Sequence, residues 1–298
     1  NMEINEAVVL DNRGFIKVSG IEASIFLQNI VTNNIEKINE NLTLFSSILT
    51  PQGKYLYEFF ILKAKDGYLL ECEKESVLEI IKVFTFYKLR SKVTLDDVSS
   101  EYISLAISLQ KFTEINKDKI LKGYTLKHKD TLIYLDPRNQ NLGAKIVSKS
   151  DKLEDVFKNL DLKKVDKEKY FNKSFNLGIV QNNLSKLKNK IFGIENNLDE
   201  LGGIDFKKGC YVGQENTSRI KLRNKLRRRI LPVIKISGNV CENNIIKYKD
   251  IEVGKIIIDT PYLFGLIKVV EPDLIEFANN ELVCGNSKVK ILKPEWIT

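Results

Sequence analysis

The side chain with the strongest case for chemistry in this sequence is the thiol of Cys210. Gly209 and Gly213 allow a tight backbone around it, and the residues after Gly213 are typical of the first turn of a short helix running toward Arg219. A helix N-terminus and a neighbouring lysine, Lys208, both stabilise a thiolate, the form that attacks electrophiles, exchanges disulfides and binds soft metals. The sequence therefore predicts a functional thiol at Cys210, with a buried and inert cysteine as the alternative.

Other chemistries are largely excluded by what the sequence lacks. Its cysteines, Cys72, Cys210, Cys241 and Cys284, form no C-x-x-C pair that would nucleate a zinc or iron–sulfur site, so no stably bound metal is expected. His128 is the only histidine, which nearly removes Ser-His-Asp triads and histidine metal sites. No P-loop or G-x-G-x-x-G motif occurs. Carboxylates, lysines, tyrosines and one thiol remain, and the scattered cysteines suit a reducing compartment.

Length and composition describe a folded protein of about two domains. The chain has 298 residues, more than one domain usually needs, and its 43% hydrophobic and 29% charged residues are close to globular averages. No apolar stretch approaches the roughly 20 residues of a membrane-spanning helix, and the N-terminus lacks a basic region followed by an apolar one. We therefore expect a cytoplasmic protein without a membrane partner.

The net charge is concentrated in one segment. The chain carries +8 at neutral pH, and Arg219–Arg229 alone holds seven basic residues and no acid, which leaves +1 for the rest. Basic residues occupy its odd positions and apolar residues such as Ile220 and Leu222 occupy even ones, so a period of two predicts an extended segment. A solvated basic strand face is one interpretation. A site for phosphates, a polyglutamate tail or RNA is the other.

The elements that position these residues begin with a helix expected from about Gly20 to Ile30. Ser19 and Glu22 have the spacing of a capping box, and apolar residues follow at helical intervals. The polar run 32–34 comes next. Strands are then expected at 42–49, 55–62 and 68–72 as an antiparallel meander, followed by an amphipathic helix over 77–84.

A similar order of elements follows in the next part of the chain. Strands are expected near 102–109, 131–135 and 144–147 around a helix near 115–121, and residues 151–180 have a helical pattern. Strands followed by a helix thus occur twice. This order predicts two loosely similar α+β halves.

The C-terminal part has a strand pattern. Apolar runs at 230–236, 251–258, 263–270, 274–277 and 289–292 are separated by turn residues at short intervals. They predict a small antiparallel barrel of about 70 residues. We therefore expect an α+β domain over 1–224 and a β-barrel domain over 225–298.

One motif resembles a known family. Eight consecutive residues, Lys208-Gly209-Cys210-Tyr211-Val212-Gly213-Gln214-Glu215, match the K-G-C-Y-x-G-Q-E signature of the YgfZ-type folate-binding proteins, which assist iron–sulfur cluster assembly. These proteins are relatives of the glycine-cleavage T-protein, an aminomethyltransferase. The similarity extends through Asn197–Phe206 and to Arg219, and more weakly to 29–34, 51–54 and the C-terminal barrel. The resemblance therefore covers essentially the whole chain.

The resemblance implies both a fold and a function. The implied fold is T-protein-like, with two similar α+β subdomains around a central tetrahydrofolate-binding opening and a small antiparallel β-barrel closing one side. The implied role is the making or maintenance of [4Fe–4S] proteins, including radical enzymes that modify tRNA. Tetrahydrofolate or a polyglutamated derivative is the implied cofactor. Iron–sulfur assembly factors or client [4Fe–4S] enzymes are the implied partners.

The resemblance also carries roles onto individual residues. The motif residues are Lys208, Gly209, Cys210, Tyr211, Gly213, Gln214, Glu215 and Arg219, and the folate-binding residues are Asn33, Asn176, Glu195, Asn197, Arg219 and Arg223. Asn176 stands where the family has an acid that helps hold the pterin ring, so weaker folate retention is expected. Glu195 is the nearest acid able to compensate. Asn224 stands where the family usually has glycine, a mild change because asparagine tolerates a left-handed backbone.

Two other functions stay open. A true aminomethyltransferase needs a carboxylate and no cysteine, but 53–58 contains only Glu58 where T-proteins carry paired aspartates, so a conventional enzyme is not favoured. An RNA-binding module could use Arg219–Arg229, although that segment contains no aromatic residue to stack on bases.

The expected mechanism has one firm constraint. A [4Fe–4S] cluster normally takes four cysteines, so Cys210 could touch a cluster only at a site shared with another protein or thiol. Whether any reaction is turned over is undecided by the sequence. A monomer is favoured over an obligate oligomer.

Overall fold

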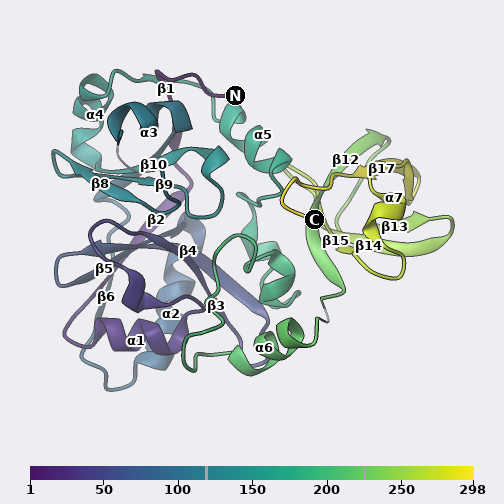
Figure 1. Ribbon diagram of the computed structural model, residues 1–298, viewed down its shortest axis with the longest axis horizontal. Coiled ribbons are helices and arrows are strands. Elements are labelled where there is room, and N and C mark those ends of the chain that lie inside the picture. The colour runs from purple at the N-terminus through teal and green to yellow at the C-terminus, as the bar shows by residue number, and fades with distance from the viewer. Residues whose placement is uncertain (118–119, 225) are drawn as a thin grey trace. The chain divides into compact units, whose positions relative to one another are not determined.

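The computed structural model describes residues 1–117, 120–224 and 226–298 (Figure 1). These residues form two units. The first consists of Asn1–Ile48, Tyr57–Tyr170 and Asp199–Val212, and the second of Leu49–Leu56, Phe171–Leu198 and Gly213–Thr298. The domain boundary expected between 224 and 225 stays a prediction, since residue 225 lies outside the described residues. In these residues no helix is long and apolar enough to cross a membrane.

The first unit is built on two sheets. One has the strand order β3 (Leu44–Leu49), β4 (Tyr55–Ala64), β5 (Gly67–Glu73), β2 (Arg13–Ser19) and β6 (Thr94–Asp97). The other has the order β11 (Lys163–Lys164), β1 (Glu6–Leu10), β7 (Tyr102–Ile107), β10 (Ala144–Lys149), β9 (Thr131–Leu135) and β8 (Thr125–His128). Six strands predicted in this part of the chain are confirmed within a few residues. The strands β1, β2, β6, β8 and β11 were not predicted.

Two helices pack on the first sheet, α1 (Ala23–Ile30) and α2 (Val77–Lys88). They meet through the rings of Phe26 and Phe84, whose centroids are 5.9 Å apart in an edge-to-face arrangement. The predicted helix near 20–30 is confirmed, but its capping box is wrong. The N-cap is Glu22 without a side-chain cap, and its carboxylate instead accepts the backbone N–H of Lys92 at 2.8 Å.

The second sheet carries α3 (Leu109–Ile115) and α4 (Leu153–Asn159). The helix predicted near 115–121 is wrong, because Ser108 caps a helix that begins directly after β7 and ends at Ile115. Its hydroxyl accepts the backbone N–H of Lys111 at 3.0 Å. Residues 118 and 119 of that prediction lie outside the described residues. The helical stretch predicted from 151 consists of α4 and α5 (Glu168–Asn176), with β11 between them.

A buried ion cluster joins the two sheets of the first unit. The Glu71 carboxylate on β5 contacts the ammonium of Lys145 on β10, and its Oε2 lies 3.5 Å from Nε of Arg13 on β2. The hydroxyl of Tyr134 on β9 donates to the same oxygen at 3.4 Å. Glu71 has no exposed surface and Lys145 is 3% exposed in its side chain. Because each charge has left water, each depends on its partners.

The ring of Phe60 lies at the centre of this cluster. The side-chain cations of Lys145, Arg138 and Arg13 lie 4.4, 4.7 and 5.8 Å from its centroid. Burial, together with the charges of Arg13 and Arg138, lowers the pKa of Lys145 to about 7 against the opposing effect of Glu71. The sheets are thus joined by a charged core as well as an apolar one.

The second unit contains the predicted barrel. Six antiparallel strands close in the order β12 (Arg228–Ser237), β15 (Phe264–Lys268), β14 (Ile251–Ile258), β13 (Ile245–Tyr248), β16 (Leu282–Cys284) and β17 (Ser287–Ile291). The strand predicted at 274–277 is wrong. It is the short helix α7 (Leu274–Phe277), which begins at Asp273 because that carboxylate accepts the backbone N–H of Ile275 at 3.0 Å.

The basic segment is not extended along its whole length. Helix α6 (Gln214–Leu222) contains its first four residues, and the strand β12 begins only at Arg228. The prediction failed because a period of two also places Arg219 and Arg223 four residues apart, which is helical spacing. Arg219 forms an ion pair with Glu215 at 3.0 Å, also four residues away. Lys225 lies outside the described residues.

The ion cluster predicts a large effect on stability. Glu71→Gln should lower the free energy of unfolding by about 3–5 kcal/mol, because it leaves Lys145 and Arg13 buried without a countercharge. Denaturant unfolding measures this loss. Asp130→Asn is the control, since Asp130 pairs with Lys127 where both side chains are largely exposed, and it should change stability little. Equal effects of the two substitutions would contradict the proposed importance of the cluster.

The cluster also predicts a dependence on pH. The pKa of Lys145 is about 7 in the folded protein against an ordinary value of 10.5, so the unfolded chain binds more protons between these values. The free energy of unfolding of the wild type should therefore rise with pH in this window relative to Lys145→Met. Below pH 7 both states are protonated and the difference should level off. Parallel stability curves for the two proteins would show that Lys145 does not titrate this way.

Candidate functional site

The loop that carries Cys210 is held at its beginning by the polar run predicted at 32–34. The hydroxyl of Thr32 donates to the carbonyl of Gly203 at 2.7 Å. The amide of Asn33 donates to the carbonyls of Gly202 and Phe45 at 2.9 and 2.8 Å. The predicted folate-binding residue Asn33 thus uses its amide donors to hold the entrance of the Cys210 loop.

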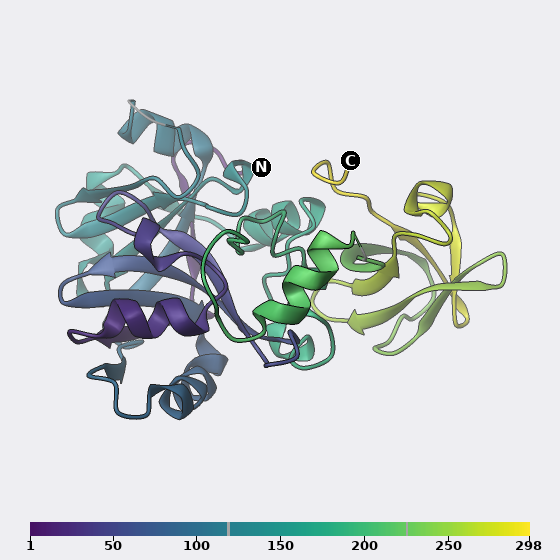
Figure 2. The same cartoon turned by 60° about the horizontal axis from the view of Figure 1, so that its bottom comes forward.

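Lys208 ties the same loop to the end of helix α1. Its ammonium donates to the backbone carbonyls of Gln28, Val31 and Asn33 at 2.8, 2.7 and 2.8 Å. A cation at this place satisfies carbonyls that lack helical partners and matches the negative end of the helix dipole. Burial lowers the pKa of Lys208 to about 8. Figure 2 shows the green loop passing the C-terminal end of the purple helix α1.

Tyr211 is the second anchor of this loop. Its side chain is buried, its hydroxyl lacks a hydrogen-bond partner, and burial raises its pKa above the ordinary value of 10.0. The Lys208 ammonium lies 5.0 Å from the centroid of its ring. Between these two buried residues, Gly209 and Cys210 are exposed and the thiol is free. The loop therefore presents an accessible thiol between two fixed neighbours.

The glycines of the motif have different requirements. Gly213 has φ +85°, and a Cβ there would lie 2.6 Å from the carbonyl oxygen of Thr50, so only glycine fits without movement. Gly209 has ordinary φ and nothing within 4 Å of a Cβ position. The predicted helix start at Gln214 and Glu215 is confirmed. Glycine is thus needed at 213 to begin α6.

A groove of about 590 Å³ in the second unit gathers Glu195 with part of the basic segment. Glu195 is 7% exposed in its side chain, and its Oε2 accepts from Nε of Arg228 at 3.1 Å. Its Oε1 accepts the backbone N–H of Phe192 at 2.7 Å. The groove is lined by Phe192, Glu195, Asn216, Ile220, Leu226, Arg227, Arg228, Lys268, Val270 and Glu271. Two of its three cations face acids of the same groove, since Arg228 pairs with Glu195 and Nη1 of Arg227 lies 3.8 Å from Oε2 of Glu271. The groove thus has a small excess of positive charge, and its size suits an elongated ligand.

Lys268 in this groove was missed by sequence reasoning. It lies opposite Arg228 in the antiparallel register of β15 and β12. Only the pairing of two strands about forty residues apart brings these cations together, so no local pattern marks Lys268. The register of the predicted barrel strands is the signal that could have found it.

The other predicted folate-binding residues lie elsewhere. Asn197 is buried, donates to the carbonyl of Ile230 at 2.8 Å and accepts from Arg229 at 3.0 Å, so its amide supports the start of the barrel. Asn176 is exposed at the end of α5. Arg219 is paired with Glu215, and Arg223 is the exposed C-cap residue of α6. Of the predicted folate-binding residues, the groove contains Glu195.

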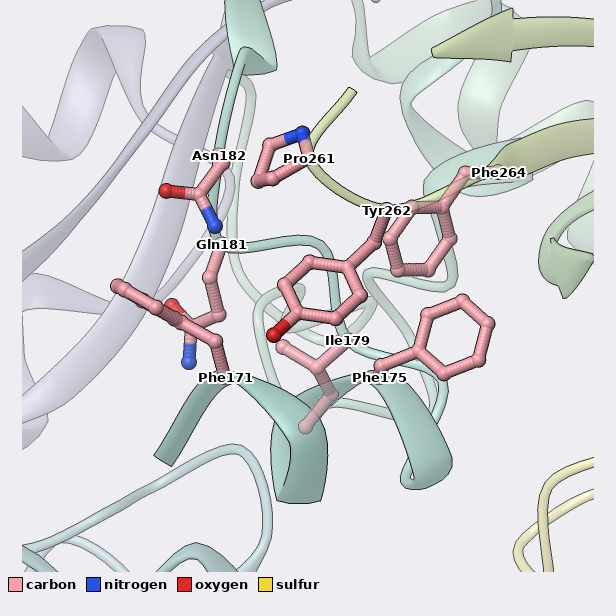
Figure 3. A pocket seen from close by; sticks show the side chains of 8 residues that line it. All are labelled: Phe171, Phe175, Ile179, Gln181, Asn182, Pro261, Tyr262 and Phe264. Atoms are coloured by element: carbon pink, nitrogen blue, oxygen red, sulfur yellow. The ribbon is translucent and has the colours of Figure 1, made fainter. Parts of the chain in front are cut away.

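A small aromatic cavity lies beside the segment that contains Asn176 (Figure 3). The ring of Phe175 lies 5.5 Å from the rings of Tyr262 and Phe264, measured between centroids. The cavity volume is about 10 Å³, which is room for about one water molecule and none for a pterin ring. Its lining residues are Phe171, Phe175, Ile179, Gln181, Asn182, Pro261, Tyr262 and Phe264.

Metal-ligating side chains do not cluster in the part of the chain that the structure describes. No three histidine, cysteine, aspartate or glutamate side chains are placed to hold an ion together.

The chain is similar in sequence to proteins named as mitochondrial iron–sulfur cluster assembly factor IBA57 homologues. It is 31% identical to that of Neurospora crassa over 232 residues, covering 76% of this chain and 52% of the relative. For Pyricularia oryzae the identity is 32% over 233 residues, covering 76% and 56%. For Dictyostelium discoideum it is 27% over 261 residues, covering 78% and 63%. The chain thus spans little more than half the length of these relatives. No family model matches the chain.

The fold is similar to that of a solved aminomethyltransferase. The glycine cleavage system aminomethyltransferase T from Bartonella henselae superposes with a TM-score of 0.74, covering 99% of this chain and 88% of that one. The sequence identity is 11%, so this likeness concerns the fold. The expected α+β fold with a small C-terminal antiparallel barrel is confirmed, and in the described residues this barrel has six strands.

The anchoring of the Cys210 loop predicts a local effect of Lys208→Met. Loss of the ammonium leaves three carbonyls without their donor, so opening of residues 203–212 should become easier by about 2 kcal/mol. Hydrogen exchange of their amides should then be roughly 30-fold faster. Lys207→Met is the matched control, because the Lys207 side chain is exposed and the substitution removes the same charge. Equal exchange in the two variants would contradict the anchoring role.

Proposed function

We propose that this chain, which is similar to the IBA57 homologues over about half of their length and resembles the YgfZ-type proteins in its motif, assists the assembly or maintenance of [4Fe–4S] proteins through the thiol of Cys210. The observation that carries this proposal is the exposure of Cys210 between the buried residues Lys208 and Tyr211. Buried cysteines are inert, whereas this thiol can reach a partner.

The proposed step is a transient contact with a cluster that another protein holds. The Cys210 thiol supplies one ligand, and the partner supplies the remaining ones. The anchored loop keeps the thiol at a fixed position, so contact costs little conformational entropy. Client [4Fe–4S] enzymes, including radical enzymes that modify tRNA, and other assembly factors are the proposed partners.

We further propose that a reduced folate binds in the groove around Glu195. Lys268 and Arg227 suit the carboxylates of a polyglutamate tail, which would compete with the exposed Glu271 for Arg227, and Phe192 and Ile220 offer apolar surface. Arg228 already neutralises Glu195, and Asn176 brings no charge. This supports weaker retention of the pterin ring than in relatives that carry the acid.

Aminomethyl transfer is the other candidate, because the fold is shared with aminomethyltransferase T. Glu58 on β4 is the acid that follows the glycine turn at Gly53, where the resemblance implies paired aspartates. An exposed Cys210 in full motif context has no use in that chemistry. The assembly role is therefore the better supported of the two.

Location within the cell is a separate proposal. The described structure contains four unpaired cysteines, two of them exposed, which suits a reducing compartment. The sequence predicts the cytoplasm, whereas the relatives are named as mitochondrial. Fractionation of cells that express the full protein separates the two locations.

Loss of the Cys210 thiol is expected to abolish function without loss of fold. Cys210→Ala should fail to restore [4Fe–4S] enzyme activity in a deletion strain, while its denaturant unfolding matches the wild type. Cys241→Ala is the control, because Cys241 is the other exposed free cysteine and lies outside the motif. Restoration by both variants would show that no thiol chemistry at Cys210 is required.

The folate proposal predicts a dependence on tail length and charge. Arg227→Gln and Lys268→Gln should each weaken binding of polyglutamated tetrahydrofolate roughly tenfold, which corresponds to about 1.4 kcal/mol. Neither substitution removes a member of the Glu195–Arg228 ion pair. Titration calorimetry at low and high salt measures this. Lys255→Gln removes the same charge from an exposed strand position outside the groove and should have no effect. Equal affinity in all variants would exclude the groove as the binding site.

A further inference from the structure

Two cysteines lie at one end of the barrel. Cys284 is the last residue of β16, has no exposed surface and belongs to the core of the barrel. Cys241 lies in the segment 238–244, which connects β12 with β13, and it is exposed. Because the two residues are far apart in the chain, only closure of the barrel brings them to the same end.

The connecting segment is bonded to the hairpin that carries Cys284. The hydroxyl of Ser287 donates to the carbonyl of Asn239 at 2.6 Å, and Ser287 is the register partner of Cys284. Val240 packs on the barrel core that contains Cys284. The residues directly before Cys241 are thus fixed against the turn between β16 and β17.

The residues after Cys241 return to the same hairpin. The side-chain carbonyl of Asn244 accepts the backbone N–H of Cys241 at 2.8 Å, and the backbone N–H of Asn244 donates to the carbonyl of Cys241 at 3.1 Å. The same side-chain oxygen lies 4.0 Å from the place that a Cβ would take on Gly285, which follows Cys284. Ile246 pairs with Cys284 in the register of β13 and β16. Cys241 is therefore held beside Cys284 from both directions of the chain.

The two thiols differ in the way that a two-step oxidation requires. Cys241 can meet a small molecule in solvent, whereas buried Cys284 can be reached only from within the protein. Burial raises the pKa of Cys284, and the charge of a Cys241 thiolate raises it further, an effect that weakens with the distance between the two sulfurs. Cys284 therefore stays a thiol until Cys241 has reacted and lost its charge.

We propose that Cys241 and Cys284 form a redox-modification site, at which a small disulfide such as glutathione disulfide converts the two thiols into one intramolecular disulfide. The Cys241 thiolate attacks one sulfur of the small disulfide, so a mixed disulfide forms and one small thiol leaves. The Cys284 sulfur then attacks the Cys241 sulfur and expels the second small thiol. Each departing thiol takes up the proton that a cysteine lost. Two protein thiols are oxidised, and one small disulfide is reduced to two thiols.

Formation of this bond moves the turn 241–244. A disulfide brings its two Cβ atoms to within about 4.5 Å, so the exposed thiol has to turn inward over the end of the barrel. In a reducing compartment the pair stays as two thiols, and it becomes oxidised when small disulfides accumulate. The site lies in the barrel and does not use the motif of Cys210, so it is independent of the proposed assembly role.

The test uses the purified full chain with the substitution Cys210→Ala, which leaves Cys241 as the exposed cysteine of the described residues. The protein is incubated with glutathione disulfide, its remaining thiols are blocked with N-ethylmaleimide, and its peptides are mapped by mass spectrometry. We expect a peptide pair joined through Cys241 and Cys284, no glutathione on the chain, and full reversal by dithiothreitol. An unreacted Cys241, glutathione that stays on it, or dimers joined through it would overturn the proposal.

A pair of core substitutions separates the role of Cys284 from a general effect of the core. Cys284→Ala should stop the reaction at the glutathione adduct of Cys241 and make this adduct at least tenfold longer-lived. Cys72→Ala is the matched control, because Cys72 is equally buried but lies in the first unit, and disulfide formation should be unchanged. Denaturant unfolding verifies that both variants are folded, and the peptide map of the unsubstituted core does not depend on them. Equal adduct lifetimes in the two variants would contradict the role of Cys284.

Discussion

The ammonium of Lys208, bonded to three backbone carbonyls at the end of α1, is the contact on which the position of Cys210 depends. The loop around Cys210 has no helix or strand of its own, so tertiary bonds must hold it. A buried cation is costly unless its donors are satisfied, and here the carbonyl of Gln28 in the last turn of α1 and those of Val31 and Asn33 just after it satisfy them. The Lys208 ammonium thus supplies donors to the carbonyls at the end of α1 and, through the same hydrogen bonds, fixes the Cys210 loop.

Several polar residues predicted to bind folate form hydrogen bonds with the protein backbone. Asn33 and Asn197 were predicted to bind folate, and both are buried with their amides bonded to main-chain carbonyls. An amide predicted to bind a ligand can therefore also serve to hold the loop that displays the site. Glu195 differs, because its carboxylate lies in the wall of a groove beside cations.

The sequence was most informative where the pattern is local. The helix start at Gln214, the barrel and the motif itself could be recognised from neighbouring residues. The Glu71–Lys145 contact and the position of Lys268 depend on residues far apart in the chain, and no local pattern marks them. Arg219–Arg223 was misread because alternation and helical spacing coincide there. Alternation of basic and apolar residues in this segment is therefore not enough to predict a strand.

The closed barrel has a consequence for how the chain meets other molecules. In the described residues all six barrel strands are paired on both sides, so the barrel offers no open strand edge to an incoming chain. The first unit does have terminal strands, and one of them, β6, carries Asp96 and Asp97, whose charges oppose the addition of another strand. Recognition by the barrel must then proceed through side chains, and at β6 the two acids discourage fibre growth by strand addition.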